Sequence, residues 1–300
     1  MQTGFGFGSL ARLGLYAAPI GLLLLATAHY FGERLEAGAS QAGSVQVAGS
    51  ETMRPVVTAC AEDFMTRNPQ ADIIVRGGGS GDGIAALLHG IVDIGMASRE
   101  LSARERDFAA SQGIALTVTG LALDGVTIIV NQATAIPALD LGQLRGIFTG
   151  KVRNWRELGG GDGEIFPFAR VQGSGTAAMF GEHVLGDEPY GASVRRLPTN
   201  EAIVAEVAAL PGTIGYADLG ATKGAGDRVT MVPLRIAPEQ APVAPTPDAV
   251  RSGDYPLART LNLGTARAPS GVARAFIEFC SGVNGQALLR RAGYVKLAAR

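Results

Sequence analysis

A short turn in the middle of the chain carries residue types suited to anion binding. Arg170 stands four residues before Ser174, in the run Arg170-Val171-Gln172-Gly173-Ser174-Gly175-Thr176, and a helix-forming segment follows. The first backbone N–H groups of a helix have no partner within the helix, and the helix dipole adds partial positive charge there. Glycines let a ligand approach this backbone, hydroxyls donate further hydrogen bonds, and a guanidinium matches an oxyanion. The pattern predicts a site for a tetrahedral or planar oxyanion.

Two earlier segments repeat this arrangement of a glycine- and serine-rich turn before a helix. One is Gly49-Ser50-Glu51-Thr52-Met53, which follows a strand-like stretch at 45–47. The other runs from Arg76 to Gly83, between a strand expected at 72–75 and a helix expected at 84–88. If the helix N-termini converge, the three turns form a cradle of N–H and O–H donors around one strong cation, Arg170.

The sequence lacks the patterns that common catalytic sites need. Ser80 lacks one and Ser174 both of the outer glycines of a hydrolase nucleophile elbow. The chain has three histidines, which are His29, His89 and His183. The nearest dinucleotide-binding match, at 81–86, has no acidic partner, and Gly150-Lys151 lacks the following Ser or Thr of a phosphate-binding loop. No group of His, Cys or carboxylates has metal-ligand spacing. We therefore expect binding without catalysis, and neither cofactor nor metal.

Simpler structural roles stay open for the same residues. Arg170 taken alone could be a surface arginine, and Thr52 and Ser80 could be helix caps, a role compatible with ligand contact. Arg99 could instead form an ion pair with a carboxylate, for which the candidates are Glu100, Asp93 and Asp124. The position of Arg170 before a Gly-Ser-Gly-Thr turn favours binding over a surface role.

Length and composition are typical of a globular protein with two domains. The chain has 300 residues, of which 47% are hydrophobic and 18% charged. Its formal net charge of −1 argues against a nucleic-acid partner. Further strands are expected at 92–97, 114–118, 124–131 and 215–217, and helices at 102–112, 141–149, 177–185, 200–209, 272–280 and 285–292. Such alternation predicts an open α/β sheet with helices on both faces, where ligands bind beyond the carboxyl ends of the strands.

The N-terminal residues predict export. Arg12 precedes an uncharged apolar run that ends in Ala26-Thr27-Ala28. Residues 1–28 therefore fit either a signal peptide cleaved after Ala28 or an uncleaved membrane anchor. Residues 29–44 would then form a tether between the membrane side and the folded part.

The two cysteines, Cys60 and Cys280, belong to no Cys-x-x-Cys pattern. In an oxidising compartment they could form a disulfide. Each also lies on the apolar face of an expected helix, where a free thiol packs as a small hydrophobic group. Both states stay open.

Taken together, these segments resemble the periplasmic substrate-binding proteins of phosphate ABC importers, and the resemblance covers nearly all of the chain after the export segment. The turns at 49–53 and 77–81 are similar to the first two phosphate loops of that family, and 93–99 is similar to its Asp-Ile-Gly-x-Ser-Ser-Arg segment. Further similar segments are 124–131, 147–155, 212–216, 255–259 and 293–295. The resemblance implies a two-domain periplasmic binding protein fold of type II, phosphate bound in the cleft between the domains, and an ABC permease of the inner membrane as partner.

The resemblance also implies which residues bind phosphate. Hydroxyl groups, backbone N–H groups and arginines make up the set, which is Thr52, Met53, Ser80, Arg99, Arg170, Ser174, Gly175 and Thr176. Met53 would contribute its backbone N–H. Thr52 and Met53 come from the first turn, and the remaining members come from the other two turns and from the 93–99 segment.

Two departures from the family pattern concern selectivity. Arg99 stands where some members have an aspartate that accepts the proton of monohydrogen phosphate, and Gln172 stands where an acidic residue is frequent. Sulfate carries no proton, so a site made only of donors suits it, whereas a carboxylate penalises it. The acceptor stays open among Asp82, Asp124 and Glu51.

These expectations combine into one functional hypothesis. One domain would join residues 45–123 and 247–300, and the other would comprise residues 124–246. Arg170 and Ser174 would come from one domain and Thr52 and Ser80 from the other, so that ligand favours the closed state. We expect an exported, monomeric phosphate-binding protein of the periplasm. The alternatives are a membrane-anchored phosphate sensor or envelope-assembly factor on the same fold, and an enzyme acting on phosphate esters.

Overall fold

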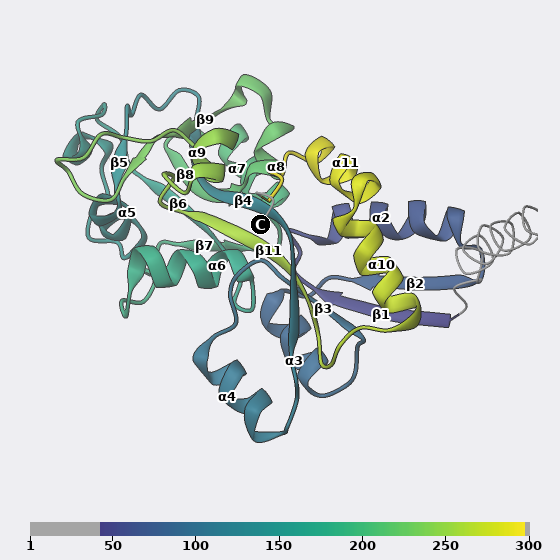
Figure 1. The fold of residues 1–300 in the computed structure, drawn as a ribbon. Coiled ribbons are helices and arrows are strands. Elements are labelled where there is room, and N and C mark those ends of the chain that lie inside the picture. The colour runs from purple at the N-terminus through teal and green to yellow at the C-terminus, as the bar shows by residue number, and fades with distance from the viewer. Residues whose placement is uncertain (1–42, 298–300) are drawn as a thin grey trace, which may run out of the picture. The chain divides into compact units, whose positions relative to one another are not determined.

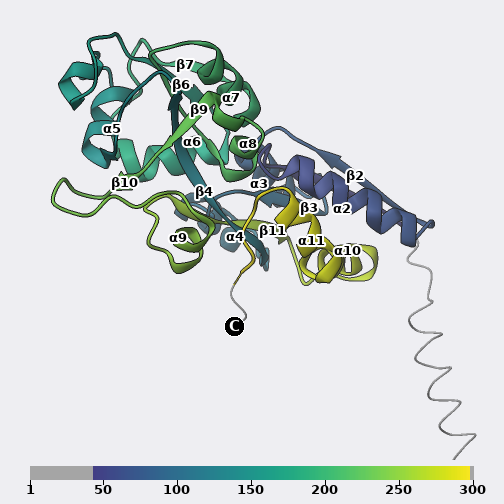
Figure 2. The same ribbon diagram turned by 90° about the horizontal axis from the view of Figure 1, so that it is seen from above.

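A computed structural model describes residues 43–297, which belong to one compact unit (Figures 1 and 2). The strands are β1 (Gly43–Gly49), β2 (Ala71–Arg76), β3 (Ile94–Ala97), β4 (Thr117–Asn131), β5 (Leu139–Asp140), β6 (Phe166–Arg170), β7 (Arg195–Leu197), β8 (Thr213–Asp218), β9 (Val229–Val232), β10 (Leu234–Arg235) and β11 (Ala258–Thr265). The α-helices are α2 (Arg54–Arg67), α3 (Ser80–Leu88), α4 (Ala103–Ser111), α5 (Leu141–Phe148), α6 (Gly175–Phe180), α7 (Asn200–Ala209), α8 (Leu219–Lys223), α9 (Pro247–Ser252), α10 (Gly271–Ser281) and α11 (Val283–Arg291). The short helical turns are η1 (Trp155–Leu158), η2 (Gly181–Leu185) and η3 (Gly226–Arg228).

The main sheet has the strand order β2-β1-β3-β11-β4-β8-β6-β7, with β9 also paired to β4. Strand β4 joins its two halves: residues 117–125 pair with β11, whereas residues 126–131 pair with β8 and β9. We name the part built on β1, β2, β3 and β11 the first half, and the part built on β8, β6, β7 and β9 the second half. In Figure 1, α2, α10 and α11 lie on one side of the first half's strands and α3 on the other.

Side-chain alternation along β4 explains why helices cover both faces of the second half. Val126, Ile128 and Val130 belong to one buried cluster with Phe148 of α5. Ile129 points to the opposite face and packs in a second cluster with residues of α7. Because successive side chains of a strand point to opposite faces, a run of apolar residues requires cover on both sides. This arrangement confirms the predicted α/β fold class.

The glycine- and serine-rich turns lie where the sequence places them. The first joins β1 to α2, the second joins β2 to α3, and the third joins β6 to α6. Each therefore stands at the carboxyl end of a strand, the edge at which open α/β sheets bind ligands. The expected helices at 102–112, 141–149 and 200–209 are found as α4, α5 and α7.

The structure differs from the sequence predictions at three elements. The expected separate strands at 114–118 and 124–131 are one continuous strand, β4, because residues 117–125 find a long antiparallel partner in β11. Strand β11 itself was not expected from the sequence. The helix expected at 177–185 is divided into α6 and the π-helical turn η2.

The first half's core contains Cys60 and Cys280, which are buried, free thiols. Val250 and Tyr255, near α9, pack in the second half's main cluster. The expected domain boundaries at 123/124 and 246/247 stay predictions.

The predicted export segment, and the tether up to residue 42, lie outside the described residues. Within 43–297, no helix has both the length and the apolar character needed to cross a membrane.

Candidate anion-binding site

Arg170, the last residue of β6, is buried and forms no ion pair with a carboxylate of residues 43–297. Its side chain is only 1% exposed. One terminal nitrogen donates to Asn200 Oδ1 at 2.6 Å and the other to the Pro198 carbonyl at 2.6 Å. Its Nε is buried and has no hydrogen-bond partner in the described part of the chain. Burial lowers the pKa of Arg170, while the neighbouring Tyr216 and Asp218 act in the opposite direction. An arginine keeps its charge in such surroundings, so the site contains an uncompensated buried cation.

Hydroxyl groups from the first and third turns meet beside this cation. Thr52 Oγ1 lies 3.2 Å from Thr176 Oγ1, and it accepts a hydrogen bond from Asn200 Nδ2 at 2.9 Å. Both threonines are buried. Met53 is also buried, but its backbone N–H donates to the Ser50 carbonyl at 3.1 Å, within its own turn. The structure thus brings Thr52 and Thr176 together, whereas the Met53 N–H has an internal partner.

The third turn lies against a pair of serines in the first half, Ser80 of the second turn and Ser98 after β3. Ser80 Oγ lies 3.2 Å from Ser98 Oγ and accepts a hydrogen bond from the Ser98 backbone N–H at 3.0 Å. Gly175 passes so close that a Cβ atom there would lie 2.2 Å from Ser80 Oγ. The backbone N–H of Gly81 donates to the Gly173 carbonyl at 3.1 Å. Glycine is therefore required at 175 by the close approach of the two halves.

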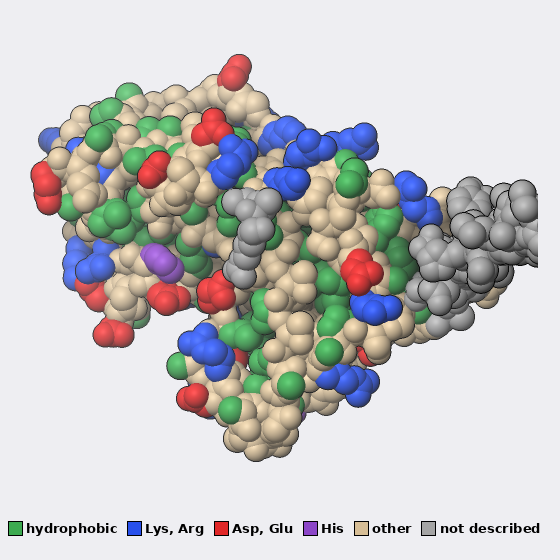
Figure 3. All heavy atoms as spheres, in the orientation of Figure 1, with side chains coloured by type: hydrophobic (Ala, Val, Ile, Leu, Met, Phe, Trp, Pro, Cys, Tyr) green, Lys and Arg blue, Asp and Glu red, His purple; other side chains and the backbone are tan. Residues whose placement is uncertain are grey.

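Ser174 occupies the N-cap of α6. Its Oγ accepts a hydrogen bond from the Ala177 N–H at 3.3 Å, and the residue is 4% exposed. The caps that the sequence left open were at Thr52 and Ser80, but the N-caps of α2 and α3 are Met53 and Gly79, neither with a side-chain cap hydrogen bond. A depression of about 300 Å³, lined by Arg99, Ser174, Tyr190 and Arg196, adjoins this cap. Figure 3 shows the molecule hollowed between α6 and α4.

Arg99 differs from the other predicted residues. Its guanidinium is held by both oxygens of Glu105, at 2.7 and 2.8 Å, and it also donates to the Glu100 carbonyl. Glu105 is fixed in turn by the capping box at the start of α4. The structure therefore does not bring the Arg99 guanidinium into the buried hydrogen-bond group. The ion pair expected as an alternative exists, but its carboxylate is Glu105.

A second buried arginine, Arg259 of β11, enters the site instead. It pairs with Asp124 Oδ2 of β4 at 2.7 Å, and both side chains are almost completely buried. One terminal nitrogen of Arg259 donates to the Ser98 carbonyl and to Thr176 Oγ1, each at 3.0 Å. The three turns alone pointed to one strong cation, Arg170, whereas the buried group contains two arginines, Arg170 and Arg259. Arg259 lay within the 255–259 segment of the family resemblance, but no local pattern marked it as a site residue.

Two further polar residues were not expected. Asn200, the first residue of α7, contacts Arg170 and Thr52, and its Nδ2 also donates to Asp218 Oδ2. Asp218 ends β8, and Tyr294 approaches its other oxygen while donating to the Thr52 carbonyl at 2.8 Å. Asn200 looked like part of a helix start after Thr199, and Asp218 looked like the residue after a short strand. Only the fold places them beside Arg170.

The three carboxylates suggested as proton acceptors are engaged or exposed. Glu51 accepts from Arg54 Nε and from the Gly78 N–H, each at 2.8 Å. Asp124 accepts from Arg259 and, at 3.1 Å, from the Leu219 N–H. Asp82 is exposed at the start of α3. None of them is therefore a free buried acceptor.

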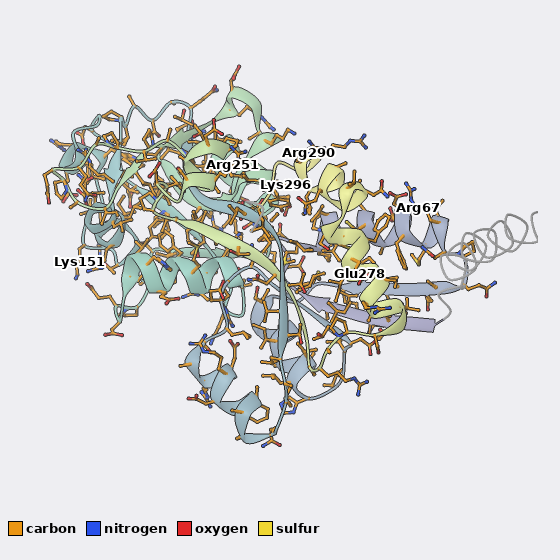
Figure 4. The ribbon with its side chains drawn as sticks, in the orientation of Figure 1. Arg67, Lys151, Arg251, Glu278, Arg290 and Lys296 are labelled. Atoms are coloured by element: carbon orange, nitrogen blue, oxygen red, sulfur yellow. The ribbon has the colours of Figure 1, made fainter. Side chains whose placement is uncertain are left out.

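Surface charges do not account for the positive character of the site. Figure 4 labels Arg67 on α2 and Lys151 after α5, which lie on the outside of the molecule. They pair with the surface carboxylates Asp63 and Glu188. Within 43–297, no group of three or more His, Cys, Asp or Glu residues could hold a metal ion. The chemistry of the site is therefore a local group of hydroxyls, amides and two guanidiniums, suited to an oxyanion.

Comparisons with known proteins agree with this geometry. Residues 36–282 match the model of the PBP superfamily domain. The phosphate-binding protein PstS of Bacillus subtilis is 35% identical over 240 residues, which cover 79% of this chain and 75% of that protein. A Clostridium perfringens protein solved with bound phosphate has a TM-score of 0.75 at 28% identity, covering 85% of this chain and all of that one.

A further solved structure is an ABC-type phosphate transport receptor from Vibrio cholerae. It has a TM-score of 0.70 at 26% identity, and the match covers 84% of this chain and 99% of that one. The similarity extends over all or nearly all of both solved structures. The chain therefore belongs to the PBP superfamily, in the family of the phosphate-binding protein PstS.

Proposed function

We propose that this protein binds inorganic phosphate between its two halves and delivers it to an ABC permease. The observation that carries the proposal is the state of Arg170, a buried guanidinium that has, among residues 43–297, neither a carboxylate partner nor a hydrogen-bond partner for its Nε. A buried charge without a counter-charge is costly, and a bound oxyanion would remove that cost. The names of the relatives favour phosphate among the tetrahedral oxyanions.

Phosphate would contact both halves at once. Thr52 and Ser80 come from turns of the first half, whereas Arg170 and Thr176 come from the second. An anion held by donors from both sides stabilises the arrangement in which they are close, so binding would favour the closed form. We take domain closure, with domains of 45–123 plus 247–300 and of 124–246, as the means by which the permease recognises the loaded state.

The proposed location is the periplasm, where the protein would act as a monomer. Support comes from the family and from the export pattern at 1–28. A mass measurement on the mature protein tests the cleavage. Loss of residues 1–28 would indicate a free periplasmic protein, and their retention would indicate a membrane tether.

The binding proposal is tested by titration calorimetry on Arg170→Ala after removal of carried-over anion. Loss of the buried counter-charge should weaken phosphate binding at least about 100-fold, since a charged hydrogen-bond group contributes roughly 3 kcal/mol or more. Arg156→Ala is the matched control, because Arg156 lies in the same half but its side chain is 68% exposed. Equal affinity of the wild type and Arg170→Ala would overturn the proposal.

A further inference from the structure

Two buried cysteines from distant segments of the chain lie in the core of the first half. Cys60 belongs to α2 and Cys280 to α10, and each side chain is at most 1% exposed. Both are members of the same buried apolar cluster, and each is a free thiol. Neither belongs to the anion-binding group, so any role they have is separate from ligand contact.

The chain from α10 to the end of α11 runs along α2 in the opposite direction. At the beginning of β1, the Gly43 N–H donates to the Gln70 carbonyl just after α2, and a Cβ atom on Gly43 would lie 3.4 Å from Val272 at the start of α10. At the other end, Tyr294 after α11 donates to the Thr52 carbonyl just before α2. Figure 1 shows α2 and α10 on the same side of the first half's strands.

An aromatic contact shows which turns of α2 and α10 face each other. The ring of Phe64 packs edge-on against the ring of Phe276, with centroids 5.6 Å apart. In helices of opposite direction, the turn before Phe64 on α2 faces the turn after Phe276 on α10, and a turn is about four residues. Those positions hold Cys60 and Cys280. In agreement, burial and then the interaction with the Cys60 side chain raise the pKa of the Cys280 thiol.

We propose that Cys60 and Cys280 form a disulfide bond when the exported protein folds. The two thiols give up two protons and two electrons, and an external disulfide, carried by a thiol–disulfide oxidoreductase or by oxidised glutathione, is reduced to two thiols. One cysteine attacks the external disulfide as a thiolate and releases the first of these thiols. The other cysteine then attacks the mixed disulfide and releases the second.

The exchange belongs to the folding process and not to the folded protein. A buried thiol with a raised pKa supplies little thiolate, and an external disulfide cannot reach it in the native core. The same burial protects the finished bond from reductants. The periplasm as the place of oxidation rests on the proposed function, whereas the pairing itself rests on the packing of the two helices.

The bond would connect the two separate chain segments that build the first half. Helix α2 precedes β4, which leads into the second half, and α10 follows β11, which returns from it. The closed loop, residues 61–279, therefore contains the whole second half. Closing so long a loop restricts the unfolded chain strongly, so the bond stabilises the native state. The first half would stay assembled while the two halves move.

Alkylation tests the bond directly on the wild-type protein. Mature protein isolated from the periplasm and unfolded in guanidinium chloride should take up no iodoacetamide unless it is first reduced. Its mass should be about 2 Da below that of the reduced protein, because two hydrogens are lost. Reduced protein refolded with oxidised and reduced glutathione should reach the same state without a glutathione adduct, and this arm does not depend on the location of the protein.

A stability comparison measures what the bond contributes. Protein that has been reduced while unfolded and then refolded with reductant should have a Tm lower by about 4 °C or more than the oxidised protein. Its phosphate affinity should equal that of the oxidised protein. The double variant Cys60→Ala, Cys280→Ala is the matched control, because reductant should leave its Tm unchanged.

The outcomes separate the bond from the proposed function. Two alkylated cysteines in the unreduced periplasmic protein overturn the disulfide, and so does refolding that ends in glutathione adducts or two free thiols. An equal Tm of the oxidised and reduced proteins overturns its stabilising role. A disulfide-bonded protein that binds no phosphate overturns the proposed function alone.

Discussion

Gly175→Ala tests whether anion binding depends on the close approach of the two halves. Gly175 begins α6 in the second half, and a Cβ atom there would lie 2.2 Å from Ser80 Oγ and 2.6 Å from Ser98 Oγ in the first half. Its φ is not positive, so alanine fits the local helix. Alanine is also a better helix former than glycine. The substitution should therefore disturb the contact between the halves and not the folding of either.

The expected loss follows from the contacts that hold the halves together. Ordinary contacts of a Cβ atom begin near 3.4 Å, so the halves must separate by roughly 1 Å to accept the methyl group. That separation lengthens the Thr52–Thr176 contact of 3.2 Å and the Arg259–Thr176 hydrogen bond of 3.0 Å beyond hydrogen-bonding range. At about 1 to 2 kcal/mol each, the two losses amount to roughly 3 kcal/mol, or about a 100-fold weaker phosphate affinity.

Calorimetry with phosphate measures this loss, and small-angle scattering of the loaded variant should show a more open particle than the loaded wild type. Gly181→Ala is the control, because a Cβ atom at Gly181 meets nothing within 4 Å and its φ of −57° suits alanine. A folded Gly175→Ala protein with wild-type phosphate affinity would refute the argument that binding requires this contact.

Three further predictions concern stability. Arg259→Ala should lower the free energy of unfolding by about 3–5 kcal/mol in urea titrations, because it leaves Asp124 buried without its partner. Phosphate at about 100 times its dissociation constant should raise stability by about 2.7 kcal/mol, seen as an increase in Tm, and no shift would count against binding. The pKa of Asp218 is raised from 3.8 to about 7 on folding, so the native state holds a proton that the unfolded chain releases. Stability should therefore fall as pH rises from about 4 to about 7, and less so in Asp218→Asn, by urea titration.

Local sequence patterns predicted the elements whose ends are marked by local chemistry. The turn at Gly49–Met53 and the cap at Ser102 locate α2 and α4, because glycine turns and capping boxes act over a few residues. Strand β11 carries no such mark. Its residues Ala258–Thr265 mix apolar and polar side chains, and its partners β3 and β4 lie more than a hundred residues earlier in the chain. Pairing over that distance is a property of the tertiary fold.

The residues of the candidate site also divide into those that local patterns predict and those that only the tertiary fold brings together. Arg170, Thr52 and Ser80 lie in recognisable turns, and the fold brings these turns together. Arg99 and Arg259 could not be told apart from the sequence, since each arginine follows an apolar strand segment or begins one. The two arginines differ in their carboxylate neighbours. Glu105, in the first turn of α4, holds Arg99, whereas Asp124 is the cross-strand partner of Arg259.

The position of the Arg259–Asp124 pair explains how Arg259 contributes both to the sheet and to the candidate site. The two residues are direct partners in the β11–β4 ladder, next to the point where β4 exchanges β11 for β8. Their ion pair is neutral as a unit, so it leaves the charge of Arg170 available for an anion. The same guanidinium contacts the Ser98 carbonyl in the first half and Thr176 in the second. If the halves separated, the Arg259–Asp124 ion pair would remain, because both residues lie in the paired strands β11 and β4. The Arg259–Thr176 contact would break, because Thr176 belongs to the second half. Arg259 therefore links the closeness of the halves to the arrangement of donors around Arg170, without itself requiring the anion as its counter-charge.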